Sequence, residues 1–189
     1  NKRIKIDLNT VKYILDIKSL SIIIKTINPN ILIDKNKLEF KSIKTNISLK
    51  SFVKKEFLID NIQISTRDIK LNDALLLLRS FKNSAELFIL SKTIQDGFLV
   101  ANIDLNFEKN GTIKNNYKIN GKIKNGKLGF LNNENLSNLN FSFKIKEKRY
   151  LLNDAEVSFK GLKFTAPSIK IKEKDNLFLI SGKFINNEK

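Results

Sequence analysis

Apolar and polar residues alternate along nearly the whole chain, and this period of two constrains the fold more than any other feature. Residues 103–107 read Ile-Asp-Leu-Asn-Phe, and residues 139–145 read Leu-Asn-Phe-Ser-Phe-Lys-Ile. Successive side chains of a β-strand point to opposite faces of the sheet, so such segments predict strands with one apolar and one polar face. About a dozen segments of this kind predict a mainly β protein.

One region departs from the alternation and predicts a short helical insert around residues 72–91. Asn72 or Asp73 is expected to cap its start, and Ser84 is expected to cap a second short helix after a break. The apolar residues of this insert recur at helical spacing, at Ala74, Leu77, Leu78, Phe81, Ala85 and Phe88.

Asn-Gly pairs predict tight turns between the strands, because a type I′ turn needs positive φ at both central residues. We therefore expect hairpin turns at Asn110-Gly111 and at Asn125-Gly126. No linker rich in Pro, Gly or Ser interrupts the pattern, so residues 1–189 predict a single β-rich domain. The chain opens at Asn1 and contains no Met, which indicates an excerpt of a longer protein.

The composition removes most of the side chains that perform catalysis. The sequence contains no His and no Cys, so the commonest general base, the commonest metal ligand and a thiol nucleophile are all missing. Residues 121–127 superficially resemble a phosphate-binding loop, but Leu128 follows Lys127 where that motif needs Ser or Thr. The sequence therefore predicts no enzyme, no cofactor and no metal site.

The chain is strongly basic, with 35 Lys and Arg against 19 acidic residues and a formal net charge of +16. The lysines are spread along the chain, and abundant Ile, Lys and Asn are typical of an A+T-rich coding sequence. Attraction to anionic head groups is the functional alternative. Nucleic-acid binding is not favoured, because Phe141 and Phe143 share the apolar face while Lys144 points the other way.

The predicted sheet has more apolar surface than the predicted helices can cover. Neighbouring strands lie ~4.8 Å apart and a helix is ~10 Å wide, so two short helices cover roughly four strands. The sheet must curl onto itself, pack against a second sheet, or leave an apolar trough. Strands as long as those predicted at residues 98–108, 116–124 and 139–146 favour an elongated sheet over a closed β-sandwich.

Residues 116–128, which read Asn-Tyr-Lys-Ile-Asn-Gly-Lys-Ile-Lys-Asn-Gly-Lys-Leu, resemble the AsmA-like family of bacterial envelope proteins. Such proteins repeat amphipathic strands that are separated by short polar turns, often with Gly beside a strand. Residues 152–161 and 178–184 are similar to the same amphipathic strand segments of the family, and residues 57–64 are similar to its strands. Residues 68–75 resemble its habit of entering a short helix directly from a strand. The resemblance covers most of the chain.

The resemblance implies an elongated, curved antiparallel β meander that forms a U-shaped groove. Its apolar face would shelter phospholipid acyl chains for transport between the inner and outer membranes, or for outer-membrane assembly. It also implies a periplasmic protein, anchored to the inner membrane through a segment not present in this chain. Envelope membranes and other envelope proteins are the expected partners, and no catalytic residue is implied.

The predicted lipid-binding residues are the apolar side chains of the later strands, with lysines at the rim of the groove facing phosphate head groups. They are Leu99, Ile103, Leu105, Phe107, Ile119, Ile123, Phe141, Phe143, Ile145, Val157 and Phe159. The alternative is a closed β-sandwich that serves as a structural or assembly module contacting other envelope proteins. In that case the same residues would be fully packed.

Overall fold

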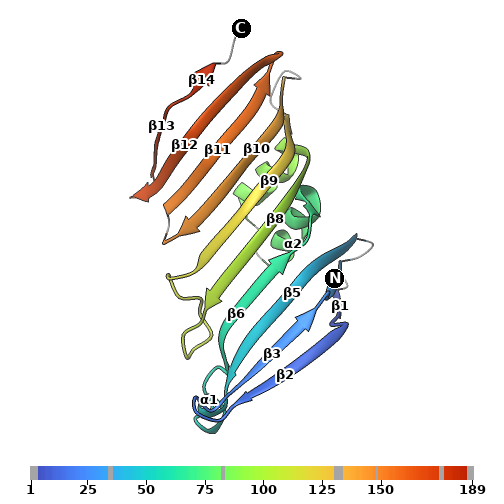
Figure 1. Ribbon diagram of the computed structural model, residues 1–189, viewed down its shortest axis with the longest axis vertical. Helices are drawn as coiled ribbons and strands as arrows, with labels where there is room; N and C mark the ends of the chain where they lie inside the picture. The colour runs from blue at the N-terminus through green and yellow to red at the C-terminus, as the bar shows by residue number, and fades with distance from the viewer. Residues whose placement is uncertain are drawn as a thin grey trace. The chain divides into compact units, whose positions relative to one another are not determined.

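The fold is mainly β, as predicted, in a computed structural model that describes residues 4–33, 36–81, 84–129, 134–147, 149–174 and 177–186 (Figure 1). The described strands are β1 (Ile4–Asp7), β2 (Thr10–Asp16), β3 (Ser21–Ile27), β4 (Asn30–Ile33), β5 (Asn36–Ser48), β6 (Ile59–Thr66), β7 (Ile69–Lys70), β8 (Ile94–Asn106), β9 (Lys118–Gly129), β10 (Asn135–Lys146), β11 (Arg149–Phe159), β12 (Leu162–Lys174), β13 (Leu177–Gly182) and β14 (Ile185–Asn186). The described helices are α1 (Leu49–Val53), α2 (Leu71–Phe81) and α3 (Ala85–Thr93).

The strands pair in the order β1-β4-β5-β6-β8-β9-β10-β11-β12-β13, with β2 on β3, β3 on β5, β7 on β8 and β14 on β12. Every described register is antiparallel, and no described pairing joins the ends of this path. The predicted open antiparallel meander is therefore confirmed. The pairing among the described residues does not produce the closed sheet of the alternative prediction.

The chain divides into two compact units, which we describe separately. The N-terminal unit contains residues 4–67 and 101–119, and the helical unit contains residues 68–100 and 120–186, each within the described ranges. The long strand β8 contributes its first residues to the helical unit and its last residues to the N-terminal unit. That residues 1–189 form a single β-rich domain stays a prediction.

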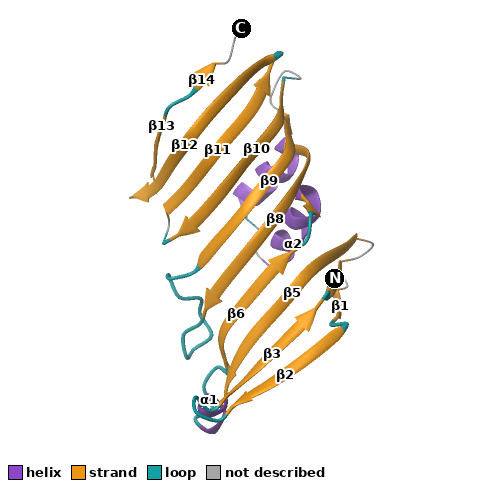
Figure 2. Cartoon of the chain, in the orientation of Figure 1, coloured by secondary structure: helices purple, strands orange, loops and turns teal. Residues whose placement is uncertain are grey.

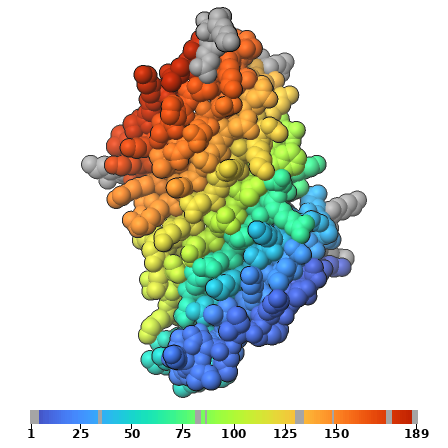
Figure 3. Space-filling view, viewed as in Figure 1, coloured from blue at the N-terminus to red at the C-terminus, as the bar shows by residue number. Residues whose placement is uncertain are grey.

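Helix α2 follows β7 without a loop and packs on its own unit through Leu71 and Leu75, which are both buried. The Leu71 Cδ1 atom lies so close to Gly97 that a Cβ there would approach it to 2.8 Å. Gly97 precedes Leu99 by two residues, so α2 lies against the apolar side of β8 at this point. Figures 1 and 2 show α2 and α3 on one side of β8 and β9. In Figure 3 the yellow to orange residues of β9 to β12 form the face of this unit that is turned to the viewer.

The structure corrects several details of the predicted helical insert. The predicted second helix is confirmed as α3. Helix α2 begins at Leu71, so Asn72 and Asp73 lie inside its first turn and are not caps. The predicted apolar face was wrong for α2, because Leu71 and Leu75 are buried while Leu78 is exposed. Four consecutive leucines at residues 75–78 leave the helical face ambiguous by one position. The Ser84 cap is confirmed, since its hydroxyl accepts a hydrogen bond from the Leu87 N–H at 3.4 Å.

Of the two Asn-Gly pairs, one lies in a turn and the other lies inside a strand. Gly111 lies in a tight turn with φ +85°, and its N–H donates to the Glu108 carbonyl at 2.9 Å. The turn at Asn125-Gly126 was wrong, because both residues lie within β9. Asn125 has φ +50°, and its N–H donates to the Asn140 side chain on β10 at 2.9 Å, the geometry of a local bulge. No described helix has the length and apolar character needed to cross a bilayer.

Candidate functional site

The strand registers of the N-terminal unit align apolar side chains in rows that run across five strands. Directly opposite residues of paired strands point to the same face, and so do residues two apart along a strand. One row is Val11, Thr26, Ile43, Ile64 and Ile103, and its neighbour is Tyr13, Ile24, Thr45, Ile62 and Leu105. These rows form one face that is apolar except for Thr26 and Thr45, and it includes the predicted lipid-binding residues Ile103 and Leu105.

The helical unit carries a comparable set of rows on its later strands. One row joins Phe143, Leu152 and Ile169, and the next joins Ile145, Tyr150, Ile171 and Ile180. Further along these strands, Phe159 lies opposite both Leu136 and Leu162, and Val157 lies opposite Phe164. The Phe141 and Phe143 rings contact each other at 6.2 Å between centroids, so the predicted residues of β10 lie together.

The remaining predicted residues lie beside or between these rows. Leu99 is opposite the buried Ile69, and Phe107 packs on Phe57 with ring centroids 5.5 Å apart. Ile119 and Ile123 lie on β9. The structure therefore brings the predicted residues together as two groups, one in each unit. The predicted lipid-binding residues did not include the isoleucines of β3, β5 and β6. The alternation at Ile62-Gln63-Ile64 marks those of β6, whereas Ile22, Ile23 and Ile24 are consecutive and do not alternate.

The predicted lipid-binding residues are all half-buried: none is fully buried, and none is largely exposed. Side chains inside a packed core are fully buried, as Phe40 and Ala101 are here with 3% and 2% of their surface exposed. Half-burial is expected where the side chains of a sheet pack mainly against lateral neighbours. Near Leu99, helix α2 also covers part of this side of β8. The arrangement leaves apolar surface that can bind apolar chains.

The opposite face is polar, and hydrogen bonds connect its side chains. The Asn61 amide donates to Asp104 at 2.6 Å and to Asn106 at 3.0 Å, and the Ser65 hydroxyl donates to Asn102 at 2.8 Å. Each unit also has three basic side chains that lie directly opposite one another on neighbouring strands of this polar face. They are Lys12, Lys25 and Lys44 in the N-terminal unit, and Lys146, Arg149 and Lys172 in the helical unit.

Like charges directly opposite each other on neighbouring strands repel, by an amount within the roughly 0.2–1 kcal/mol range of cross-strand pairs. We therefore expect Lys25→Gln to raise the midpoint of thermal unfolding, and added NaCl to stabilise the unsubstituted protein by screening. Lys5 lies opposite Leu32, so Lys5→Gln is the matched control and should change stability less. A Lys25→Gln protein that unfolds at a lower temperature would show that the three lysines do not repel.

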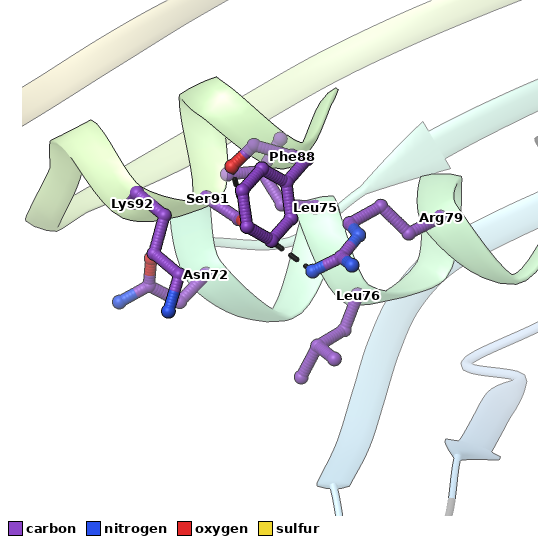
Figure 4. Close-up of a pocket in the computed structure, with 7 residues that line it drawn as sticks. All are labelled: Asn72, Leu75, Leu76, Arg79, Phe88, Ser91 and Lys92. Carbon is purple, nitrogen blue, oxygen red and sulfur yellow. Dashed lines mark hydrogen bonds between the residues drawn. The ribbon is translucent and has the colours of Figure 1, made fainter. Parts of the chain in front are cut away.

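A separate pocket of about 310 Å³ lies between α2 and α3 (Figure 4). The Arg79 guanidinium and the Lys92 ammonium lie 5.5 and 5.7 Å from the centroid of the same Phe88 ring. Arg79 also donates to the Ser91 hydroxyl at 3.3 Å, while its buried Nε has no hydrogen-bond partner. Neither cation takes part in a described ion pair, so this pocket has the chemistry to hold an anionic group. Sequence reasoning missed it, because the pocket depends on how the two helices pack.

The described residues contain no group of three or more His, Cys, Asp or Glu side chains placed to hold a metal ion. Comparison of the chain with protein-family models, with curated proteins and with solved structures found no match.

Proposed function

We propose that this chain is a non-enzymatic lipid-handling segment whose apolar sheet face shelters phospholipid acyl chains. The proposal places it in the bacterial envelope, with lipid transport between the inner and outer membranes, or outer-membrane assembly, as its role. It joins the resemblance to AsmA-like proteins with the apolar rows of the two units. Lipid identity and the direction of transport are not part of the proposal.

The observation that carries the proposal is the half-burial of the predicted lipid-binding residues, which lie on the apolar rows or beside them, opposite a polar, hydrogen-bonded face. A row such as Ile43, Ile64 and Ile103 offers apolar contact without a specific polar partner. Burial of each methylene stabilises by ~0.8 kcal/mol, so a chain with about eight buried methylenes gains roughly 6 kcal/mol before ordering costs. Such a face would hold acyl chains without discriminating between head groups.

Native mass spectrometry of gently purified protein tests the proposal. We expect a population whose excess mass matches phospholipids, and solvent extraction of the same sample should release those lipids. Acyl chains should dissociate when the protein is unfolded, because only the paired strands assemble the apolar rows. Protein that is consistently free of lipid after extraction from bacterial membranes would contradict the proposal.

A second candidate is an assembly module that contacts other envelope proteins. The exposed edge strand β13 favours it, because its side chains from Leu177 to Ile180 are all apolar and all largely exposed. An unprotected edge of this kind readily pairs with a strand of another chain. The same mass measurement separates the candidates, because an assembly module would be lipid-free and bound to protein.

A further inference from the structure

One end of the N-terminal unit combines exposed apolar side chains with lysines. The loop between β2 and β3 and the helix α1 with its following turn lie together there, because the Leu49 N–H donates to the Leu20 carbonyl at 2.9 Å. Strands β3 and β5 meet at the same end, where Ser21 lies opposite Ser48. We call this end the basic tip. It consists of Ile17, Lys18, Leu20, Lys50, Phe52, Val53, Lys54 and Lys55.

The apolar residues of the basic tip are among the most exposed in the described chain. Phe52 is 71% exposed, Val53 is 81% exposed, and Ile17 is 75% exposed. Single exposed apolar residues are ordinary on a protein surface, but several together at one protruding end mark an interaction site. These side chains do not belong to the apolar rows of the sheet, since they lie in the loop and the helix beyond the strand ends.

Hydrogen bonds fix the backbone of α1 and of the turn that follows it, and this backbone carries Phe52 and Val53. The Ser48 hydroxyl caps α1 by accepting from the Ser51 N–H at 3.2 Å, and Ser51 is buried beneath the turn. The turn after the helix closes with Lys55 N–H donating to the Phe52 carbonyl at 3.2 Å and Glu56 N–H donating to the Ser51 carbonyl at 3.0 Å. The backbone of the tip is therefore ordered before binding, which lowers the entropic cost of docking.

The charge of the basic tip selects its partner. Lys18, Lys50, Lys54 and Lys55 are all exposed, and none takes part in a described ion pair. Two nearby acids are engaged: Glu56 pairs with Lys109 at 3.2 Å, and the Asp16 carboxylate accepts from the Lys18 and Ser19 N–H groups. Asp60 and Glu108 line a pocket with Lys50 and Lys54, so the four lysines outnumber these two acids at the tip. Lysines around an apolar wedge complement the surface of an anionic bilayer, where cations meet phosphates and apolar side chains enter the acyl boundary.

We infer that the basic tip docks this chain on the surface of an anionic lipid bilayer. Phe52 and Val53 enter the interface, and the four lysines contact the phosphates. This inference goes beyond the proposed acyl-chain face and does not depend on it. A nucleic-acid partner fits the lysines but gives no role to the exposed valine and isoleucine.

A single tryptophan reports the docking directly, because the natural sequence contains none. Phe52→Trp should show a blue-shifted emission with vesicles of 30 mol% phosphatidylglycerol in phosphatidylcholine, and brominated lipid should quench it. The matched control is Asn102→Trp, an exposed position on the polar face of β8 in the same unit, which should show neither effect. Equal blue shifts for the two variants would overturn the inference.

Vesicle co-sedimentation measures the energetics of the same contact. Phe52→Ser with Val53→Ser should weaken binding to anionic vesicles at least tenfold, and pure phosphatidylcholine should bind the unsubstituted protein at least tenfold more weakly. Lys54→Gln with Lys55→Gln should weaken binding more than Lys25→Gln with Lys44→Gln, which removes the same charge from the polar face. Equal losses for the two lysine pairs, without any effect of the serine variant, would show attraction by net charge alone and overturn the inference. The serine variant should still carry lipid on the sheet, so failure here is distinct from failure of the proposed function.

Discussion

Gly121→Ala is expected to destabilise the protein by about 3 kcal/mol, because the added methyl group would overlap atoms of the two neighbouring strands. A Cβ at this position would lie 2.5 Å from the Val100 carbonyl oxygen and 2.6 Å from the Phe143 ring. The carbonyl belongs to the neighbouring strand β8, so relief of the overlap requires movement of a paired backbone. For a chain of this length the loss should lower the unfolding midpoint by roughly 6–12 °C, measured by circular dichroism and urea titration.

Gly161→Ala is the matched control for this substitution. No atom lies within 4 Å of a Cβ built at Gly161, so its only penalty is the positive φ of +83° in the turn between β11 and β12. That conformation costs an alanine roughly 1–2 kcal/mol. Adding Phe143→Leu to Gly121→Ala should restore part of the lost stability, since it removes one of the two overlaps. Equal stability for the two alanine variants would show that β8, β9 and β10 do not approach as described.

The outcome at Gly121 also shows what the sequence could predict. The alternation around Gly121 predicts a strand, and β9 is a strand, because the face of each residue follows from its position alone. The alternation does not tell which strands pair or in which register. The overlap of Gly121 with Phe143 therefore comes only from the structure.

The Asn125-Gly126 pair shows a second limit. A hairpin turn and a bulge both place Asn at positive φ, so the dipeptide alone cannot separate them. The alternation that resumes at Leu128 is the signal that the strand continues. Asn110-Gly111 lacks such a continuation, and there the structure has a turn, although Gly111 and not Asn110 has positive φ, so the turn is not the predicted type I′.

The sequence could predict which residues of the candidate site are apolar, but not how they line up across strands or how far they are buried. Alternation identified apolar residues such as Ile103 and Phe143 strand by strand, and the structure adds the registers that turn them into rows. The half-burial of these rows could not be predicted, because it depends on whether a second layer covers the face. The Arg79 and Lys92 pocket depends on helix packing, which no local pattern encodes.

Ile103→Asp is expected to remove most of the bound lipid, lowering the lipid recovered per protein at least tenfold. Ile103 lies opposite Ile64 at one end of an apolar row and is half-buried. A carboxylate at this position keeps its water in the lipid-free protein but must lose it beneath an acyl chain. Burial of an unpaired polar group costs several kcal/mol, and each 1.4 kcal/mol is a factor of ten in affinity.

Asn102→Asp is the matched control, because it adds the same charge one residue away on the opposite face. Asn102 is exposed and accepts a hydrogen bond from the Ser65 hydroxyl at 2.8 Å, which a carboxylate would also accept. This variant should keep its lipid and its unfolding temperature. Lipid content is measured by extraction and mass spectrometry, and stability by thermal unfolding.

The stability of the Ile103→Asp protein shows whether the apolar face around Ile103 is open or sealed. A carboxylate on an uncovered face should lower the unfolding midpoint only modestly, whereas one forced into a sealed core would leave an unpaired buried charge and unfold the domain. A folded Ile103→Asp protein that has lost its lipid, beside an Asn102→Asp protein that retains it, is the result expected of an acyl-chain surface. A folded Ile103→Asp protein with undiminished lipid would mean that the chains lie elsewhere.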